Sequence, residues 1–208
     1  MNARTRFFSG AAVAVTALLL LSLAPAARAE IGAPVSAGLG GGARSVYLAS
    51  GTEDPDPIPT WQSFSAPGSG RAVLNPQGAA NGDGPPSLAV NLVSGDALAV
   101  WARHVASGFE VVLSSFAGIS WSDPVVLSGP SASGMDPAIV VAQDGAVHVV
   151  WWEDGAPPRV LHRQAPADLS AWSEPLWVSQ PGETACRPHA VIHGSVLRVS
   201  YELHDYDL

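Results

Sequence analysis

The sequence predicts an all-β fold built from repeated units of four short antiparallel strands. Two observations carry this prediction. Short apolar runs rich in Val recur between clusters of Gly, Pro, Asp and Ser, which is the pattern of strands separated by turns. The landmarks of one unit also return at a fixed interval of about fifty residues, and an interval of that length is typical of architectures made from repeated supersecondary units.

The register of the repeat is set by proline and aromatic landmarks. Pro86, Pro137 and Pro188 are spaced by 51 residues, Trp101, Trp151 and Tyr201 by 50, and Trp121 and Trp172 by 51. Apolar runs and turn residues recur together with these landmarks. Four strands per unit at this period indicate the blades of a β-propeller. A β-sandwich is the alternative, because it also has regularly spaced strands.

The stretch from Asp136 to Pro175 shows one unit in full. Its first two strands are near-continuous apolar runs, as expected when neighbouring blades cover both faces. Asp144-Gly145 supplies a hairpin turn between them. The aromatic residue late in the second strand offers a large surface for burial between blades. The Trp-Ser-acid-Pro sequence marks the outer strand, where an edge tolerates Pro.

Composition divides the chain into a signal, a leader and the repeats. Arg4 and Arg6, the apolar run 11–23 and the small residues before Glu30 have the pattern of a secretory signal peptide. We therefore expect a secreted or periplasmic protein, cleaved near Ala29 and free of the membrane afterwards. The expected segments are a signal peptide at 1–29, a flexible Gly-rich leader at 30–43, and propeller repeats at 44–208, with units at about 44–84, 85–135, 136–187 and a partial unit at 188–208.

Charge and cysteine content exclude several classes of function. Of the 10 Lys and Arg residues, three lie in the signal, which leaves 7 against 18 acidic residues and a net charge of 7 − 18 = −11. Nucleic acids and anionic membranes require clustered positive charge, so we expect neither as a partner. Cys186 is the single cysteine, which forbids an intrachain disulfide. We expect it to be a small buried residue, and a bridge to another chain stays open.

The repeats resemble the BNR or Asp-box repeats of sialidase-like β-propellers. The resemblance covers Pro85 to Glu202 and, more loosely, Val46 to Ala66. The box S-x-D-x-G-x-T-W is matched at Ser114 to Trp121 by the Ser, Gly and Trp, with Phe116 in place of Asp. The resemblance implies a propeller in which these boxes are structural turns, on the face away from the usual ligand site.

The predicted blades number about three, whereas closed propellers have four to eight. Three interpretations follow from the cost of exposed sheet edges. The chain is a fragment of a larger propeller, it forms a homodimer that completes a six-blade ring, or it stays an open array.

Topology brings together polar residues where the first strand of a unit begins and the second ends, because adjacent strands of a blade are antiparallel. The candidate ligand-binding residues are Arg103, His104, Asp136, Glu153, Asp154, Arg187 and Glu202. Carboxylates, Arg and aromatic side chains at this end suit a sugar. The alternative is that these loop ends are polar because they contact water.

The sequence favours a module that binds without catalysis, and no catalytic residue is assigned. Tyr201 and Glu202 are neighbours in one strand and point to opposite faces, so they cannot form the Tyr–Glu pair of a sialidase. His189 and His193 lack a third ligand, so no metal is expected, and no cofactor motif is present. We predict a secreted, non-catalytic propeller that binds carbohydrate or protein through one face. The alternatives are a sialidase-like glycoside hydrolase, whole or truncated, and an inactive fragment of a larger propeller.

Overall fold

The computed structural model describes residues 35–39, 42–49, 58–63, 71–74, 82–117, 120–129 and 133–204, and only the backbone of the strands before Leu74. All regular structure in these residues is β. The strands are β1 Val35–Leu39, β2 Gly42–Ala49, β3 Ile58–Ser63, β4 Arg71–Val73, β5 Ser87–Val90, β6 Ala97–Val105, β7 Gly108–Phe116, β8 Val125–Val126, β9 Ser133–Val141, β10 Val147–Asp154, β11 Arg159–Ala165, β12 Leu176–Trp177, β13 Ala185–His193 and β14 Val196–Leu203. The predicted signal, 1–29, lies outside the described residues.

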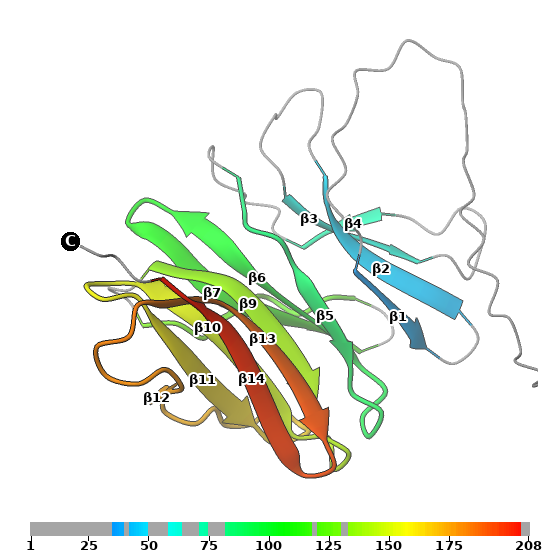
Figure 1. Cartoon of the computed structure of the whole chain (residues 1–208). Coiled ribbons are helices and arrows are strands. Elements are labelled where there is room, and N and C mark those ends of the chain that lie inside the picture. The colour runs from blue at the N-terminus through cyan, green and yellow to red at the C-terminus, as the bar shows by residue number, and fades with distance from the viewer. Residues whose placement is uncertain are drawn as a thin grey trace, which may run out of the picture.

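The strands form antiparallel sheets in sequence order, as the propeller prediction requires. Blade one is β1–β4, blade two β5–β8, blade three β9–β12, and β13–β14 make a half-blade. The first strands of successive sheets lie against one another, with contacts of β1 to β5, β5 to β9 and β9 to β13 (Figure 1). These first strands therefore line an axis, while the short β8 and β12 lie at the outer edges of their blades.

The larger part of the core lies between blades two and three, and a smaller cluster that contains Trp101 packs with Leu74 at the end of blade one. β6 and β10 are largely buried, as their near-continuous apolar sequences predict. Trp101 and Trp151, at equivalent repeat positions, are both fully buried. The largest cluster of buried apolar side chains draws residues from both blades: Leu98, Val100, Val111, Leu113, Leu127, Ile139, Val147, Val149, Trp151 and Leu161.

A buried amide joins the turns of these two blades. Asn91, which is 1% exposed, donates from Nδ2 to the carbonyl oxygens of Gly145 at 3.0 Å and Ala167 at 3.2 Å. Its Oδ1 accepts the backbone N–H groups of Val93 and Ser94. A fully bonded buried amide specifies one arrangement of its partners, so Asn91 fixes blade two against blade three.

The first blade differs from the sequence prediction. The segment 30–43, predicted as a flexible leader, contains β1, which pairs with β2 from Val35↔Val46 to Leu39↔Gly42. Its Gly-rich sequence has no strand periodicity, and backbone pairing alone makes it a strand. The first unit therefore begins before residue 44. The described chain forms three sheets and a half-blade, which is more than the three blades that the six-blade ring assumed. No helix in this part of the chain is long and apolar enough to cross a membrane.

Candidate functional site

A pocket of about 350 Å³ opens at the end of the sheets where β5, β9 and β13 begin, here called the proximal end. The residues that line it form equivalent tripeptides from three successive sheets. These are Pro85-Pro86-Ser87, Asp136-Pro137-Ala138 and Arg187-Pro188-His189. We call it the axial pocket, because the strands that supply it are the ones that pack around the axis.

The same backbone irregularity shapes the pocket in each of the last two sheets. The register between β9 and β10 shifts at Asp136-Pro137, and that between β13 and β14 shifts at Arg187-Pro188. These are bulges, in which two residues face one on the partner strand and the side chain is re-aimed. Proline suits the position because it has no N–H to pair.

Asp136 and Arg187 adopt an uncommon backbone conformation within these bulges. Their φ angles are 46° and 48°, in the left-handed region that non-Gly residues seldom occupy. Such strain costs of order 1–3 kcal/mol and gathers at ligand sites and clamps. Its repetition at the same repeat position, with an acidic residue in one blade and a basic residue in the next, marks these two side chains for a role in the pocket.

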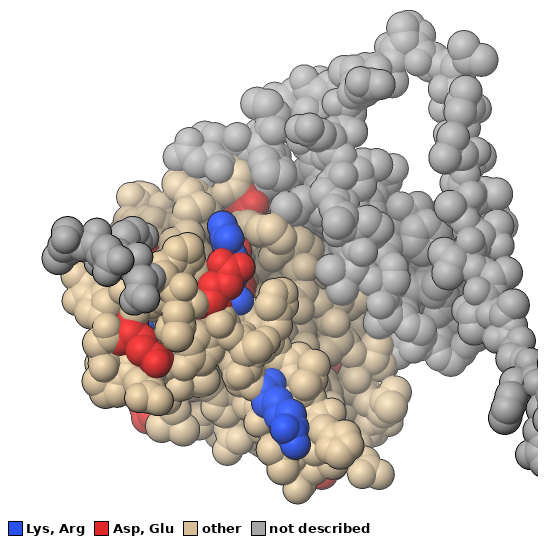
Figure 2. All heavy atoms as spheres, viewed as in Figure 1, with Lys and Arg blue, Asp and Glu red and all other residues tan. Residues whose placement is uncertain are grey.

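Each of these side chains is held by its own sheet. The Trp152 indole Nε1 donates to Asp136 Oδ2 at 2.9 Å, and Arg187 Nη1 donates to Glu202 Oε2 at 3.1 Å. Trp152 and Glu202 occupy equivalent positions, 50 residues apart. The Arg187–Glu202 side chains are 63% and 51% exposed, so their ion pair adds little stability and serves to orient both groups. Charged side chains are sparse on the face in Figure 2, and acidic and basic groups adjoin near its centre.

The structure divides the seven predicted site residues among three places. Asp136 and Arg187 line the axial pocket, and Glu202 lies beside it on Arg187. Glu153 and Asp154 line a second cleft at the proximal end of blade three. Glu153 is buried and bound by Trp151 Nε1 at 3.3 Å and Arg159 Nη2 at 3.2 Å, so its carboxylate supports the fold.

Arg103 and His104 line neither space. Arg103 pairs with Glu110 across β6 and β7 at 2.7 Å. The His104 backbone N–H donates to Asp83 Oδ1, and its ring packs edge-on against Phe109. Both residues follow Trp101 in the way that Glu153 and Asp154 follow Trp151, but in blade two they join β6 to its neighbours.

Several residues that line these two spaces were not predicted from the sequence, and Arg159 and Glu183 of the second cleft are among them. Ser87 and His189 line the axial pocket, and Trp177 lines the second cleft. Ser87 and His189 directly follow the landmark prolines, so aligning the repeats one residue further would have found them. Trp177 follows the outer-strand motif, where the preceding blade has Val126.

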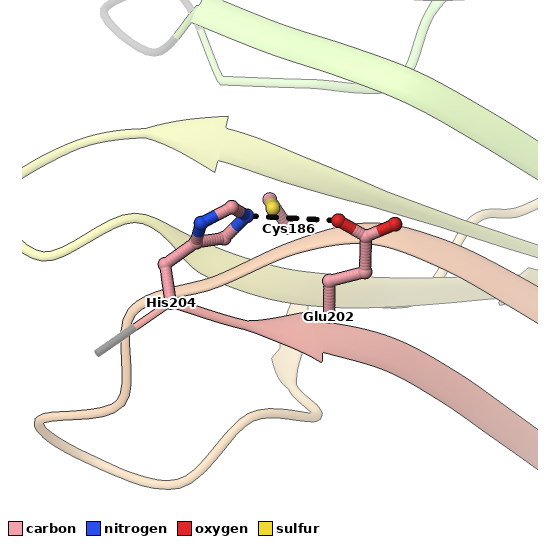
Figure 3. A group of neighbouring side chains, drawn as sticks. All are labelled: Cys186, Glu202 and His204. Atoms are coloured by element: carbon pink, nitrogen blue, oxygen red, sulfur yellow. Dashed lines mark ion pairs between the residues drawn. The ribbon is translucent and has the colours of Figure 1, made fainter. Parts of the chain in front are cut away.

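A mixed group of donor side chains lies next to the pocket on β13 and β14. The ligand-type atoms of Cys186, Glu202 and His204 all lie within 4.8 Å of one another, with the sulfur between the other two groups (Figure 3). Thiolate, imidazole and carboxylate are donors that Zn²⁺ accepts. Arg187, however, bonds the same Glu202 oxygen that His204 approaches at 3.6 Å, and its positive charge opposes a cation there.

The Cys186 thiol is held in its neutral form. The side chain is buried, as predicted. Burial raises the pKa of the thiol, the Glu202 charge raises this pKa further, and Arg187 partly offsets both effects. The thiolate is the reactive form of cysteine, so the structure provides no activated nucleophile at this position.

A histidine pair lies on β10 and β11, towards the opposite end of blade three. His148 Nδ1 and His162 Nε2 are 3.0 Å apart, and the rings stack with centroids 5.3 Å apart. Burial, followed by the charge of His148, lowers the pKa of His162 to about 4. Burial also lowers the pKa of His148, although Asp144 opposes this shift.

Because of this histidine pair, we expect the chain to become less stable as the pH is lowered. An unfolded His protonates near pH 6.5, whereas His162 in the fold stays neutral until about pH 4. The unfolded state therefore binds protons first, and the free energy of unfolding decreases as the pH falls from about 6.5 to about 4. We expect a decrease of about 1 kcal/mol, because solvent screens this half-exposed pair. Urea unfolding at pH 7 and pH 5 measures it.

The variant His162→Gln provides the comparison, and exposed His193→Gln is the matched control. His162→Gln should lose less stability than the wild type between the two pH values, while His193→Gln should follow the wild type. Identical pH dependence in all three proteins would contradict the assignment.

Comparison with solved structures shows a propeller-type fold. The chain is similar to a thermostable family-43 glycoside hydrolase, with a TM-score of 0.55 and 12% identity over 85% of this chain and 67% of that one. It is also similar to the Trypanosoma rangeli sialidase, with a TM-score of 0.52 and 10% identity over 82% of this chain and 34% of that one. A third is the exo-β-1,3-galactanase of Phanerochaete chrysosporium, with a TM-score of 0.51 and 10% identity over 83% and 44%.

The chain thus spans about two thirds of the first of these proteins and less than half of the other two. No family model matches the sequence, and no curated protein matches it. At 12% identity or less the likeness concerns the fold, because one fold hosts many unrelated functions. The sheets and their order are those of β-propeller proteins.

Proposed function

We propose that this protein is an exported β-propeller module that binds carbohydrate in the axial pocket without hydrolysing it. The observation that carries the proposal is the repeated bulge that turns Asp136 and Arg187 into one pocket, each with φ near +47° and each held by its own sheet. A carboxylate that accepts hydroxyl hydrogens and a guanidinium that donates to hydroxyl oxygens are complementary to a polyhydroxylated ligand.

The size and composition of the pocket fit a small polar ligand. A volume of about 350 Å³ is at the lower end of small-molecule sites and suits one or two sugar rings. Ser87 and His189 add hydrogen-bonding groups, and the four prolines supply rigid apolar walls. Because Asp136 and Arg187 are already oriented before a ligand binds, less side-chain entropy is lost on binding.

The carboxylates support binding rather than hydrolysis. Glycoside hydrolysis generally requires two carboxylic groups on either side of the scissile bond. Among the described residues that line the axial pocket, Asp136 is the single carboxylate. The nearest further one, Glu202, is paired with Arg187. This arrangement favours binding of the sugar without cleavage of the glycosidic bond.

The variant Asp136→Asn tests the proposal. Asn tolerates the left-handed backbone, so the fold should be kept, while the ligand loses a charged acceptor. We expect binding of the best ligand from an array of neutral and acidic glycans to weaken at least about tenfold, since a hydrogen bond to a charged group contributes about 1.5–3 kcal/mol. Isothermal titration calorimetry measures the loss.

The matched control is Glu174→Gln, which changes an exposed carboxylate that lines none of the described clefts, and should bind like the wild type. Failure of the wild type to bind any glycan on the array would contradict the proposal. Release of reducing sugar by the wild type, abolished in Asp136→Asn or Glu202→Gln, would instead establish the glycoside hydrolase alternative.

A further inference from the structure

A second cleft, of about 490 Å³, lies at the proximal end of blade three. It lies between the loop that follows β10 and the loop that precedes β13, with Trp177 of β12 in its wall. Its first wall adjoins the axial pocket: Glu153 and Asp154 pair with Gly134 and Ser133, only two and three residues before Asp136 on β9. The two spaces therefore open at the same end of one blade.

We infer that this cleft is a second sugar subsite, which binds a further residue of a neutral oligosaccharide whose end occupies the axial pocket. The inference rests on the proposed function and extends it from a single sugar to a chain. Four features of the cleft carry it: an exposed aromatic ring, the immobilisation of that ring, a fixed carboxylate in the same cleft, and the local charge.

Trp177 presents a large apolar surface to solvent. It is 55% exposed, and the equivalent residue of blade two is Val126. The outer strand of a blade does not require a tryptophan, since valine serves in the neighbouring one. Aromatic rings line ligand pockets because they offer a broad apolar face beside polar groups, and the C–H-bearing face of a sugar ring is complementary to such a surface.

The ring is fixed before any ligand arrives. The guanidinium carbon of Arg159 lies 4.6 Å from the Trp177 ring centroid, in the range of a cation–π contact. Arg159 is itself bound to Glu153 Oε2 at 3.2 Å, and Glu153 is 4% exposed. A buried carboxylate thus anchors the arginine, and the arginine covers one face of the tryptophan. A preformed platform avoids the entropic cost of ordering a side chain on binding.

A second carboxylate is held in the wall of the cleft. Glu183 Oε2 accepts the backbone N–H of Gln180 at 2.8 Å and the hydroxyl of Tyr201 at 3.0 Å. Tyr201 belongs to β14, so the half-blade fixes a group in the loop that precedes β13. Fixed carboxylates are good acceptors for sugar hydroxyls.

The charge of the cleft selects among sugars. Glu153, Asp154 and Glu183 supply three carboxylates against the single guanidinium of Arg159. Like charges near one another raise the cost of binding, so uronic acids and sialic acids are disfavoured there. The chemistry is that of a neutral oligosaccharide.

The variant Trp177→Val tests this inference, since it installs the residue that blade two carries at this position. The probes are neutral mono- to hexasaccharides of xylose, arabinose, galactose and glucose, with oligogalacturonates as the anionic set. We expect the wild type to bind tri- to hexasaccharides about tenfold more tightly than the matching monosaccharide. Trp177→Val should lose this gain and bind the monosaccharide unchanged. Leu176→Val, at an exposed neighbour outside the cleft, should behave like the wild type.

The outcomes separate the two proposals. Two results would overturn the second subsite and leave the axial-pocket proposal intact. The first is binding that depends on Asp136 but is equally strong for short and long ligands. The second is a gain in affinity with ligand length that is retained in Trp177→Val. Tighter binding of oligogalacturonates than of neutral chains would overturn the charge argument. Absence of binding to every probe would contradict both proposals.

Discussion

Replacing Trp151 by alanine should lower the free energy of unfolding by about 4 kcal/mol, which is a large part of the total stability of a typical domain. The side chain is fully buried within the cluster that joins blades two and three, so its removal leaves a cavity that both sheets line. The indole Nε1 also donates to the buried Glu153 carboxylate at 3.3 Å, and this donor is lost. Urea unfolding followed by circular dichroism measures the change.

The milder variants Trp151→Phe and Trp101→Phe keep this prediction testable if the alanine variant does not fold. The two tryptophans occupy equivalent positions and are equally buried, but Trp101 Nε1 has no hydrogen-bond partner among the described residues. Trp151→Phe loses a bond to a charged group and should cost about 1–3 kcal/mol more than Trp101→Phe. Equal losses in the two variants would show that the indole–carboxylate bond contributes nothing.

Replacing Gly145 by alanine should lower the free energy of unfolding by about 3 kcal/mol. Gly145 has φ of +86°, and a Cβ there would lie 2.7 Å from Ala167 Cβ and 3.0 Å from Val93 Cβ. The left-handed backbone costs an L-residue about 1–2 kcal/mol, and overpacking adds about 1–3 kcal/mol. The clash would also separate the turns that Asn91 joins.

Gly95 is the matched control, because it occupies the corresponding turn of blade two. Its φ is +80°, and a Cβ there would meet nothing within 4 Å. Gly95→Ala should therefore show the backbone cost alone, about 1–2 kcal/mol. The difference between the two variants, measured by urea unfolding, gives the cost of the inter-blade clash. A difference near zero would show that the blades move apart freely at this contact.

Much of the fold followed from local patterns. The spacing of Trp101 and Trp151 predicted equivalent buried positions, and Asp144-Gly145 predicted a turn. These features can be predicted from the sequence because a strand buried on both faces needs apolar residues throughout, and a tight turn needs glycine. The strand β1 was missed because its sequence, VSAGL, carries no such pattern, and it is a strand only through pairing with β2.

The candidate site was predictable only in part. Asp136 and Arg187 stood out because each precedes a landmark proline, and the antiparallel rule placed them at one end. The same rule also selected Arg103 and Glu153, but Arg103 forms an ion pair with Glu110, and Glu153 forms one with Arg159. Ion pairing of this kind depends on side chains that meet across strands, and the repeat spacing contains no information on it.

By itself, the sequence determined an all-β chain of antiparallel four-stranded units with a period of about fifty residues and a polar proximal end. The tertiary structure decided which polar residues share a space. The bulges at Asp136 and Arg187 aim two opposite charges into one pocket, and the anchored Trp177 forms a separate platform. The physical reason is that strand periodicity is local and repeats with the chain, whereas a binding site depends on contacts between blades, which each blade makes with different side chains.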